Sequence, residues 1–349
     1  MKTELIPVDQ ENIDRSVMMR AGEVIRRGGL VAFPTETVYG LGGNGLNPRS
    51  SKAIYAAKGR PSDNPLILHI ADRNELYSLV AEISEAAEKL MDAFWPGPMT
   101  LVFPKSDLVP METTGGLDTV AVRMPSHPIA LELIRKAGVP IAAPSANASG
   151  RPSPTRASHV WEDMEGRIEI ILDGGEVGIG LESTIIDLTD GIPTILRPGY
   201  ITQSMIEEVI GHTEVDKAST GENSEHLRPK APGMKYRHYA PRAEMTLVSG
   251  EHTSVCEKIL ELALEQKNCG KVRIICTEET RPVFSGLDAV SAGFRSHPEM
   301  IAHNLFRLLR EADQDEVDVL LSETFEETEL GTAVMNRLMK AAGYRIIHV

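Results

Sequence analysis

The spacing of apolar residues along the first 210 positions switches repeatedly between a helical and a strand-like period. Residues 15–29 place apolar side chains on one face of a helix and end in two glycines, and residues 30–33 form a short apolar run typical of a buried strand. Helices and strands interleave too often for an all-β protein, so we expect α/β layers. The same patterns predict helices over 50–59, 75–94 and 128–138, and strands over 66–70, 99–104, 119–125, 139–145, 167–175, 183–189 and 193–199.

The alternation resumes in residues 244–349. The predicted strands there are 243–250, 271–277, 288–294 and 317–324, and the predicted helices are 253–267, 297–314 and 331–343. This order favours a small, mostly parallel, Rossmann-like sheet. A chain of 349 residues is long for one domain. We therefore expect a first domain over residues 1–211 and a second over residues 244–349.

Residues 212–243 join the two predicted domains and have no apolar periodicity. Their first part, up to residue 227, is typical of a solvated linker. From His226 to Arg242, however, the chain has five Lys or Arg residues and no acid, with aromatic residues between them. A plain spacer does not need that composition. We interpret residues 226–242 as a segment that folds back over a binding site.

Composition excludes several classes of protein. The net charge of -14 disfavours nonspecific attraction to nucleic acid or anionic membranes, although it allows a local basic cleft. No apolar run is long enough for a membrane-spanning helix, and the N-terminus lacks the pattern of a signal peptide. The spacing of Cys256, Cys269 and Cys276 matches neither a zinc site nor a redox pair, so we expect buried, reduced thiols. These features favour a cytoplasmic protein.

The stretch "GLGGNG" (residues 40–45) satisfies the G-x-G-x-x-G pattern of dinucleotide-binding proteins. That fingerprint requires glycines that follow a strand directly and open a helix. Here "PTETVYG" intervenes after the predicted strand, and "LNPRS" precedes the next helix. We therefore reject a nicotinamide or flavin site and expect a turn with positive φ values at these glycines. The chain also lacks a P-loop motif.

Short apolar strands in the first domain repeatedly end in small polar loops or in an arginine. In open α/β sheets, ligands bind where such strand ends converge. Lys58 and Arg60, at the predicted end of helix 50–59, add two cations. Each side chain alone could simply satisfy its own backbone or a surface ion pair. Together they suit a ligand with phosphate and carboxylate groups. The strand-end residues are Thr35, Thr37, Arg123, Ser145, Asn147, Ser149, Ser183, Thr184 and Arg197.

His69 alternates with Leu68 and Ile70 in the predicted strand 66–70. It therefore points away from the face that those two residues share, and the pattern alone favours a structural histidine over a functional one. The chain has no His/carboxylate cluster with the spacing of metal ligands, so we expect no protein-bound metal.

The residues "KGR" (58–60) and "SAN" (145–147) together resemble the K-x-R…S-x-N signature of L-threonylcarbamoyladenylate synthases, whose catalytic domain is YrdC-like. "PGMKYRHYAP" (232–241) is similar to the linker of the family's two-domain form. The resemblance covers nearly the full length. It implies a twisted open α/β sheet with a concave basic cleft, followed by the smaller Rossmann-like domain. Further blocks that resemble the family, in order, are "FPTETVYGLG", "NPLILHI", "FWPGPMTLV", "VRMP", "APSANASG", "LESTIIDL" and "ILRPG".

Members of that family join L-threonine, bicarbonate and ATP into L-threonylcarbamoyladenylate and release pyrophosphate. The resemblance implies this nucleotidyl transfer here, with Mg²⁺ held mainly by the ATP phosphates. A separate tRNA threonylcarbamoyl transferase complex would then use the product to modify a tRNA adenosine. The resemblance implies neither a membrane partner nor strong direct binding of nucleic acid.

The family's motifs also imply roles for individual residues. The catalytic set would be Lys58, Arg60, Ser145 and Asn147. ATP would be bound by Lys58, Ser62, Thr119, Asn147, Thr155, Arg197 and Tyr236. L-Threonine would be bound by Thr35, His69, Arg123, Ser145 and Ser183. The Arg123 guanidinium matches a carboxylate bidentately, and His69 becomes a site residue rather than a structural one.

Two further expectations concern dynamics and stability. Residues 232–241, with Tyr236, would close over the nucleotide as a lid and keep water from labile intermediates. Lys58 is expected to be an exposed cleft cation, so that its removal would lower turnover and leave the fold intact.

Two other functions compete with the synthase interpretation. An RNA-binding module would use the predicted basic cleft and residues 226–242, but the net acidity and the absence of an aromatic RNA-binding signature argue against it. A carbamoyl-transfer enzyme that uses carbamoyl phosphate would share the adenylate chemistry. The linker block and the second domain favour the synthase over that relative.

Overall fold

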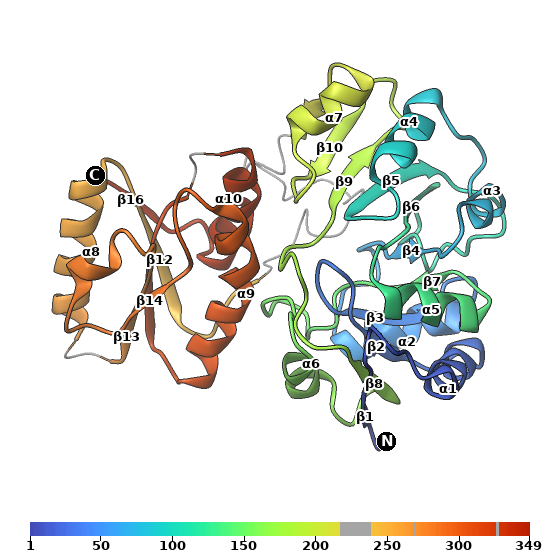
Figure 1. Cartoon of the computed structure of the whole chain (residues 1–349), viewed down its shortest axis with the longest axis horizontal. Helices are drawn as coiled ribbons and strands as arrows, with labels where there is room; N and C mark the ends of the chain where they lie inside the picture. The colour runs from blue at the N-terminus through green and yellow to red at the C-terminus, as the bar shows by residue number, and fades with distance from the viewer. Residues whose placement is uncertain (217–238, 268–269, 326–327) are drawn as a thin grey trace. The chain divides into compact units, whose positions relative to one another are not determined.

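The computed structural model describes residues 1–216, 239–267, 270–325 and 328–349 (Figure 1). The chain divides into two compact units, each with its own sheet. The first unit comprises residues 1–149, 153–178 and 182–235, and the second comprises residues 150–152, 179–181 and 236–349. The second unit thus includes two short segments from much earlier in the chain than the predicted linker.

The first unit is a mixed α/β structure around one large sheet, as expected. Among the described residues, its strands lie in the order β1-β8-β2-β3-β7-β4-β6-β5-β9-β10-β11. Strand β6 pairs in parallel with β4 and antiparallel with β5. The bounds are β1 (Glu4–Pro7), β2 (Val31–Phe33), β3 (Gly40–Asn44), β4 (Ile67–His69), β5 (Met99–Pro104), β6 (Thr119–Arg123), β7 (Ile141–Ala142), β8 (Ile170–Asp173), β9 (Thr184–Asp187), β10 (Thr194–Arg197) and β11 (Glu214–Val215).

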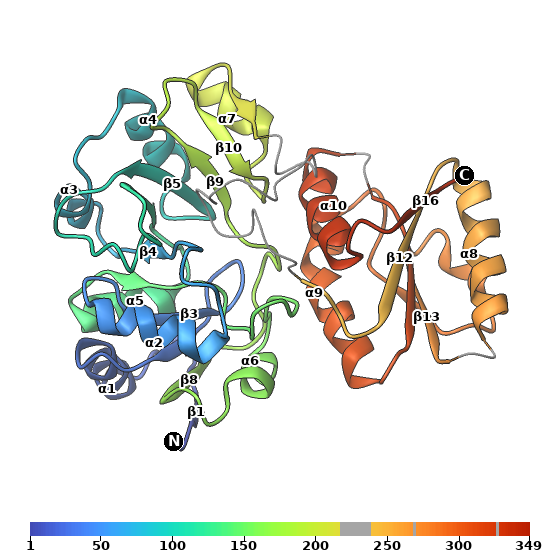
Figure 2. The same ribbon diagram turned by 180° about the vertical axis from the view of Figure 1, so that it is seen from behind.

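Helices flank this sheet. Helix α1 buries Met18, Ala21 and Ile25 and lies beside α5 (Figure 2). A side chain at Gly22 would lie 2.6 Å from the backbone carbon of Lys136, so only glycine allows this close approach. The helices are α1 (Arg15–Arg26), α2 (Pro48–Lys58), α3 (Leu76–Leu79), α4 (Glu85–Phe94), α5 (Pro128–Ala137), α6 (Ala157–Met164) and α7 (Gln203–Ile210).

Helix α2 begins two residues before the predicted range of 50–59 and ends at Lys58. The side chain of Asn47 caps it by accepting a hydrogen bond from the Arg49 amide at 3.0 Å, and Pro48 occupies the first turn. Gly59 ends it with a φ of 63°, a left-handed conformation that favours glycine. Lys58 is therefore the last helical residue.

The helix predicted over residues 75–94 is wrong as a single element. Val80 leaves the helical conformation and forms an isolated β-bridge with Lys105. A new helix then begins after Ser84, whose hydroxyl accepts a hydrogen bond from the Ala87 amide at 3.2 Å. Apolar periodicity continues across the break because both helices face the same core, and the cap at Ser84 is the signal that marks it.

The turn predicted at "GLGGNG" is also wrong. Gly40–Asn44 form β3 between β2 and β7, and none of the four glycines from Gly40 to Gly45 has a positive φ. These glycines serve close packing instead. A side chain at Gly42 would lie 2.8 Å from both Ile141 and Phe33. Glycine is therefore required here, because the neighbouring side chains leave no room for a Cβ atom.

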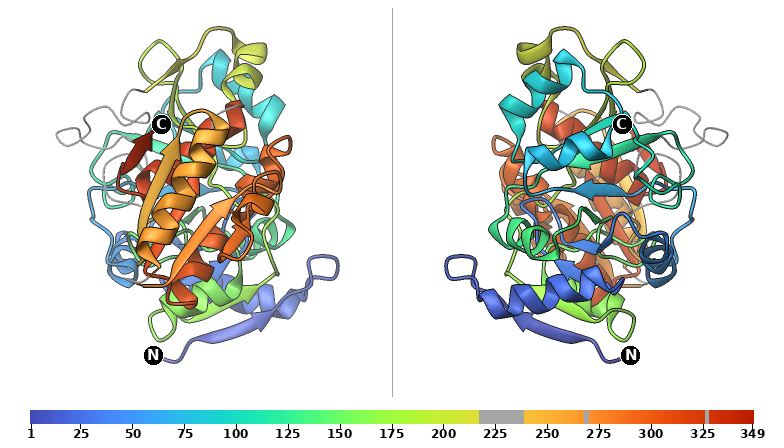
Figure 3. Two further views of the ribbon diagram at one scale, coloured as in Figure 1. Left: turned by 90° about the vertical axis from the view of Figure 1, so that its left-hand side faces the viewer. Right: turned by 90° about the vertical axis from the view of Figure 1, so that its right-hand side faces the viewer.

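The second unit has a parallel sheet in the order β14-β13-β15-β12-β16 among the described residues, which confirms the mostly parallel arrangement. Helix α8 covers one face, and α9 and α10 cover the other (Figures 1 and 3). The bounds are β12 (Glu244–Ser249), α8 (His252–Gln266), β13 (Val272–Cys276), β14 (Ala289–Ser291), α9 (Pro298–Gln314), β15 (Val319–Glu323), α10 (Glu329–Ala341) and β16 (Ile346–His348).

Two expectations from composition concern the cysteines and membrane-spanning helices. Cys256 and Cys276 are buried and form no disulfide, as predicted, whereas Cys269 lies outside the described residues. None of the described helices has both the length and the apolar character to cross a bilayer.

Candidate active site

Strand register places three polar side chains in one row across the first unit's sheet. Arg123 on β6 is the register partner of His69 on β4 and of Thr100 on β5. Register partners project from the same face of a sheet. The alternate residues Leu68, Leu101 and Val122 belong to the main apolar core, so the polar row faces away from that core.

A β-bulge brings a second arginine to this face. The register of β9 and β10 shifts between Ile195 and Arg197, so that Arg197 lies opposite Ile185. Strict alternation would place Arg197 on the same face as Ile195, in the core. Instead its guanidinium donates to the Ser183 carbonyl and to the Ser183 hydroxyl, both at 3.1 Å.

Ser183 connects Arg197 to the polar row. Its hydroxyl lies 2.7 Å from that of Thr100, and both side chains are buried. Arg197 and Arg123 therefore lie on either side of a pair of hydroxyls. Positive charge at both ends of a buried, hydrogen-bonding group suits an anionic ligand.

The loop after β2 supplies the remaining contacts of Arg123. Its guanidinium donates to the Thr37 hydroxyl at 2.9 Å, to the Glu36 carboxylate at 2.6 Å and to the Gly97 carbonyl at 3.2 Å. Thr35 shapes the loop, because its hydroxyl lies 2.8 Å from that of Thr37 and donates to the Val38 carbonyl. We call the assembled residues the arginine group: Thr35, Glu36, Thr37, His69, Thr100, Arg123, Ser183 and Arg197.

His69 is buried and neutral. Burial, aided by the positive charge of Arg123, lowers the pKa of its imidazole to about 3. Nδ1 lies 3.2 Å from the Ile67 carbonyl, and the ring meets that of Phe33 edge to face. The predicted orientation away from Leu68 and Ile70 is consistent with this packing. A neutral imidazole beside Arg123 adds no charge to the arginine group.

Lys58 lies in a second cluster and is not the exposed cation that the sequence suggested. It is 3% exposed. Its ammonium donates to the backbone carbonyls of Ser145 and Asn147, the latter at 2.6 Å. The hydroxyl of Ser145 also donates to the side-chain oxygen of Asn147. We call Lys58, Ser145 and Asn147 the lysine group; its cation holds the loop after β7 by the backbone.

One short segment links the two groups. Its first part, Glu36 and Thr37, contacts Arg123. Its last part reaches the loop after β7: the carbonyl of Tyr39 accepts a hydrogen bond from the Ala146 amide at 2.8 Å, and Gly40 bridges Ser145. The arginine group and the lysine group therefore lie in one neighbourhood of the first unit.

The other predicted site residues have the following positions. Arg60 donates to the carbonyls of Asn64 and Pro65, so it holds the turn that follows α2, and Ser62 in that turn is exposed. Thr119 begins β6, and Thr155 is buried beside His159. Tyr236 and most of the predicted lid lie outside the described residues.

Sequence reasoning missed Glu36 and Thr100. The stretch "PTET" drew attention to its two threonines, and the acid between them resembled an ordinary loop residue. Thr100 lay inside an apolar strand pattern. Strand register places Thr100 opposite Arg123, and the loop after β2 places Glu36 against its guanidinium. Neither pairing can be read from the local sequence pattern.

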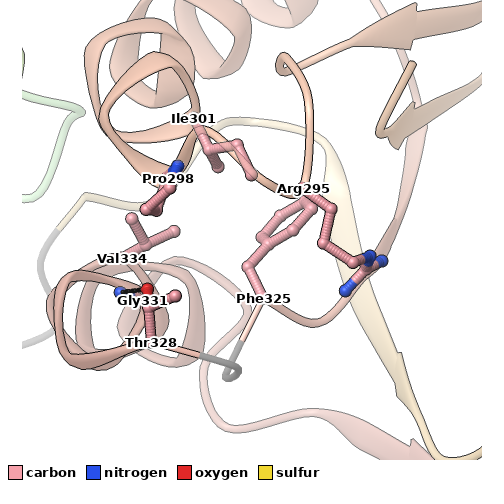
Figure 4. Close-up of a pocket in the computed structure, with 7 residues that line it drawn as sticks. All are labelled: Arg295, Pro298, Ile301, Phe325, Thr328, Gly331 and Val334. Carbon is pink, nitrogen blue, oxygen red and sulfur yellow. Dashed lines mark hydrogen bonds between the residues drawn. The ribbon is translucent and has the colours of Figure 1, made fainter. Parts of the chain in front are cut away.

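The second unit has polar features of its own, none of which was predicted as part of the site. Glu323 accepts hydrogen bonds from the Thr277 amide and the Thr280 hydroxyl and pairs with Arg295. An open pocket of about 410 Å³ is lined by residues that include Glu278, Arg281 and Ser285. A cavity of about 10 Å³ lies between α9 and α10, with Ile301, Phe325 and Val334 around it (Figure 4). That volume admits at most about one water molecule. Among the described residues of the whole chain, no three His, Cys, Asp or Glu side chains gather as a metal site would require.

Comparison with family models gives two matches that together span most of the chain. A model described as "Telomere recombination" (Sua5_yciO_yrdC) matches residues 23–199. A model described as "Threonylcarbamoyl-AMP synthase, C-terminal domain" matches residues 201–343. The arginine and lysine groups lie within the first match.

Curated relatives and a solved structure agree with these matches. The chain is 54% identical to a threonylcarbamoyl-AMP synthase of Pyrococcus abyssi, over 97% of this chain and 98% of the relative. It is 49% identical to one of Bacillus subtilis, over 97% and 96%. The crystal structure of P. abyssi Sua5 complexed with L-threonine matches with a TM-score of 0.93 and 53% identity, covering 99% of this chain and 100% of that one.

Proposed function

This chain belongs to the threonylcarbamoyl-AMP synthase family, and on that premise we propose how its residues carry out the family's reaction. The enzyme makes L-threonylcarbamoyl-AMP, the intermediate for threonylcarbamoyl modification of tRNA adenosine. The observation that carries the proposal is the joint presence of the arginine group and the lysine group around residues 35–40.

The reaction has two steps in our proposal. The threonine ammonium and bicarbonate form a carbamate, and they release a proton and water. A carbamate oxygen then attacks the α-phosphorus of ATP, and pyrophosphate leaves as the new P–O bond forms. No enzyme nucleophile takes part. The protein instead aligns anions that repel each other and stabilises the charge that spreads over the α-phosphate.

We assign L-threonine to the arginine group. The guanidinium of Arg123 has five N–H donors, and its described contacts with Gly97, Thr37 and Glu36 use three of them. The remaining donors suit the threonine carboxylate. Thr35, His69, Ser145 and Ser183 would surround the rest of the amino acid. The complex of P. abyssi Sua5 with L-threonine supports this choice of ligand.

We assign the ATP phosphates to the lysine group and its neighbours. Lys58 places positive charge directly beneath the loop that carries Ser145 and Asn147. The loop can therefore present hydroxyl and amide donors to a phosphate while the buried ammonium attracts it. Arg60, Ser62, Thr119, Thr155, Arg197 and Tyr236 remain predicted contributors to catalysis or to nucleotide binding.

Mg²⁺ would enter with ATP. The residues proposed for the nucleotide are hydroxyl, amide and cationic side chains without a carboxylate, and such a set fits a metal held by phosphate oxygens and water. The ion would offset phosphate charge. We further propose that the enzyme is a nucleotidyltransferase of the cytoplasm, and that a tRNA threonylcarbamoyl transferase complex takes up its product.

One assay tests the function and separates it from its competitors. The protein is incubated with ATP, L-threonine and bicarbonate, and pyrophosphate is measured in the absence of RNA. We expect release that depends on threonine and on bicarbonate. Release driven only by carbamoyl phosphate would favour the carbamoyl-transfer enzyme, and RNA binding without any release would favour the RNA module. Omitting each substrate in turn is the control.

A further inference from the structure

Glu36 is a largely enclosed acid beside Arg123, and its two carboxylate oxygens differ in their contacts. Oε1 accepts the hydrogen bond from Arg123 at 2.6 Å, and the Glu36 side chain is 14% exposed. Oε2 is itself buried and makes no hydrogen bond of ordinary geometry with the described residues, although the backbone amides of Glu36 and Ser126 lie near enough to lower the pKa of the carboxyl. A buried acceptor without a well-placed donor is unfavourable, and more so when it is charged. Such an atom is a natural place for a ligand's donor.

The carboxylate of Glu36 is held in its ionised form. Burial is the largest effect and opposes ionisation. The charge and hydrogen bond of Arg123, together with the backbone amides of Glu36 and Ser126, outweigh it and lower the pKa of the carboxyl below its ordinary value. The imidazoles of His69 and His127 lie close enough to sense its charge, and burial lowers the pKa of both. The two imidazoles therefore add no positive charge beside the Glu36 carboxylate, whose cationic partner is Arg123.

We propose that Glu36 is a specificity-determining residue whose Oε2 accepts a hydrogen bond from the α-amino nitrogen of L-threonine; the assignment rests on the proposed function. An amino acid carries its carboxylate and its amino nitrogen on one carbon atom. Arg123 and Glu36 likewise place a cation and an anion side by side. A carboxylate on the free donors of Arg123 brings the amino nitrogen of the same molecule toward Glu36.

This contact lasts through the first chemical step. The nitrogen carries N–H bonds as an ammonium, as the neutral amine that attacks carbon, and as the carbamate. Oε2 of Glu36 can therefore hold the nitrogen while its charge changes. With the carboxylate on Arg123 and the nitrogen on Glu36, the orientation of the substrate's α-carbon is set. The pair thus selects amino acids over hydroxy acids or deaminated acids.

The first test measures ligand affinity in Glu36→Gln. The amide oxygen can still accept from Arg123, but its NH₂ group then faces the substrate nitrogen, so donor meets donor. We expect the Kd for L-threonine to rise roughly tenfold or more, because hydrogen bonds to charged groups contribute about 1.5–3 kcal/mol. The Kd for ATP should stay within about twofold. Glu85→Gln, an exposed acid on α4, is the matched control and should leave both unchanged.

A second ligand separates recognition of the nitrogen from support of Arg123. (R)-3-Hydroxybutyrate is L-threonine without its amino group. Wild-type protein should bind it at least about tenfold more weakly than threonine, and Glu36→Gln should change that weak affinity by less than about twofold. Equal loss for both ligands would mean that Glu36 acts only by positioning Arg123, and would overturn the proposal. An unchanged threonine Kd in Glu36→Gln would also overturn it.

The proposal stays testable if Glu36→Gln does not fold. Equal affinity of the wild-type protein for threonine and (R)-3-hydroxybutyrate would overturn it without any variant. The proposed function fails in a different way: wild-type protein that releases no threonine-dependent pyrophosphate is not the synthase, whatever Glu36 contacts.

Discussion

The ammonium of Lys58 holds the backbone carbonyl of Ser145, although 87 positions separate the two residues in the chain. The two motifs that resemble the family signature thus meet through a side chain and a backbone atom. A lysine in this position supports the site and the fold together.

Lys58→Ala should therefore lower both turnover and stability. Removal of the ammonium leaves the carbonyls of Ser145 and Asn147 without their buried donor, which is unfavourable by about 1–3 kcal/mol for each group. Thermal unfolding and pyrophosphate release measure the two effects. Lys52→Ala, an exposed lysine on the same helix, should change neither. An unaltered melting temperature in Lys58→Ala would show that the carbonyls find other partners.

Thr100→Val should weaken threonine binding without touching either arginine. The change keeps the shape of the side chain and removes the hydroxyl that pairs with Ser183 at 2.7 Å. We expect a loss of about 1 kcal/mol in unfolding free energy and a several-fold rise in KM for threonine. Thr253→Val, at the exposed start of α8, is the control. A KM equal to that of the wild type would separate Thr100 from the site.

His69 predicts a particular dependence of stability on pH. Burial and Arg123 lower its folded pKa to about 3, whereas an unfolded histidine titrates near 6.5. Between these values the unfolded chain binds a proton that the folded protein does not. The stability that the neutral, buried His69 contributes is therefore complete above pH 6.5. Below that pH it falls by up to about 1.4 kcal/mol per pH unit.

Urea denaturation of the wild type and His69→Gln at pH 7, 6 and 5 measures this contribution. The stability advantage of the wild type should shrink as the pH falls, because glutamine does not titrate. Glu36 remains ionised over this range, since its pKa is lowered. His252→Gln, an exposed histidine, should run parallel to the wild type. If the pH dependence of stability in His69→Gln also runs parallel to that of the wild type, the imidazole of His69 is solvated in the folded protein.

Gly42→Ala should destabilise the first unit although alanine suits a strand better than glycine. The added methyl group would lie 2.8 Å from both Ile141 and Phe33, so β3 or its neighbours would have to shift. We expect about 1–3 kcal/mol of lost unfolding free energy. At Gly178 the nearest atom would be 3.9 Å away, so Gly178→Ala should lose less than about 1 kcal/mol. A stable Gly42→Ala protein would show that this packing yields easily.

The sequence predicted those elements whose formation depends on local pattern. The Asn47 cap, Pro48 and the final glycine of α2 specify that helix within about a dozen residues. The alternation of His69 with two core residues gave its orientation for the same reason. The break at Val80 was missed because the apolar period is unbroken there and its cause is a bridge to a distant strand.

The details of the site depend on partners that are remote in sequence. The burial of Lys58 follows from carbonyls on another loop, and the direction of Arg197 follows from a bulge against β9. Glu36 becomes notable only beside Arg123. Apolar periodicity cannot predict such pairings. The resemblance to a family pointed to several of the residues, but it did not explain their geometry.

The row formed by His69, Arg123 and Thr100 also bears on how this protein can change during evolution. Because side chains alternate along a strand, inserting one residue within β6 would turn Arg123 toward the apolar core and bring Val122 or Met124 in its place. No single substitution would repair that. Length variation among descendants of this chain should therefore accumulate in the surface connections, such as residues 188–193, while β4, β5 and β6 keep their lengths.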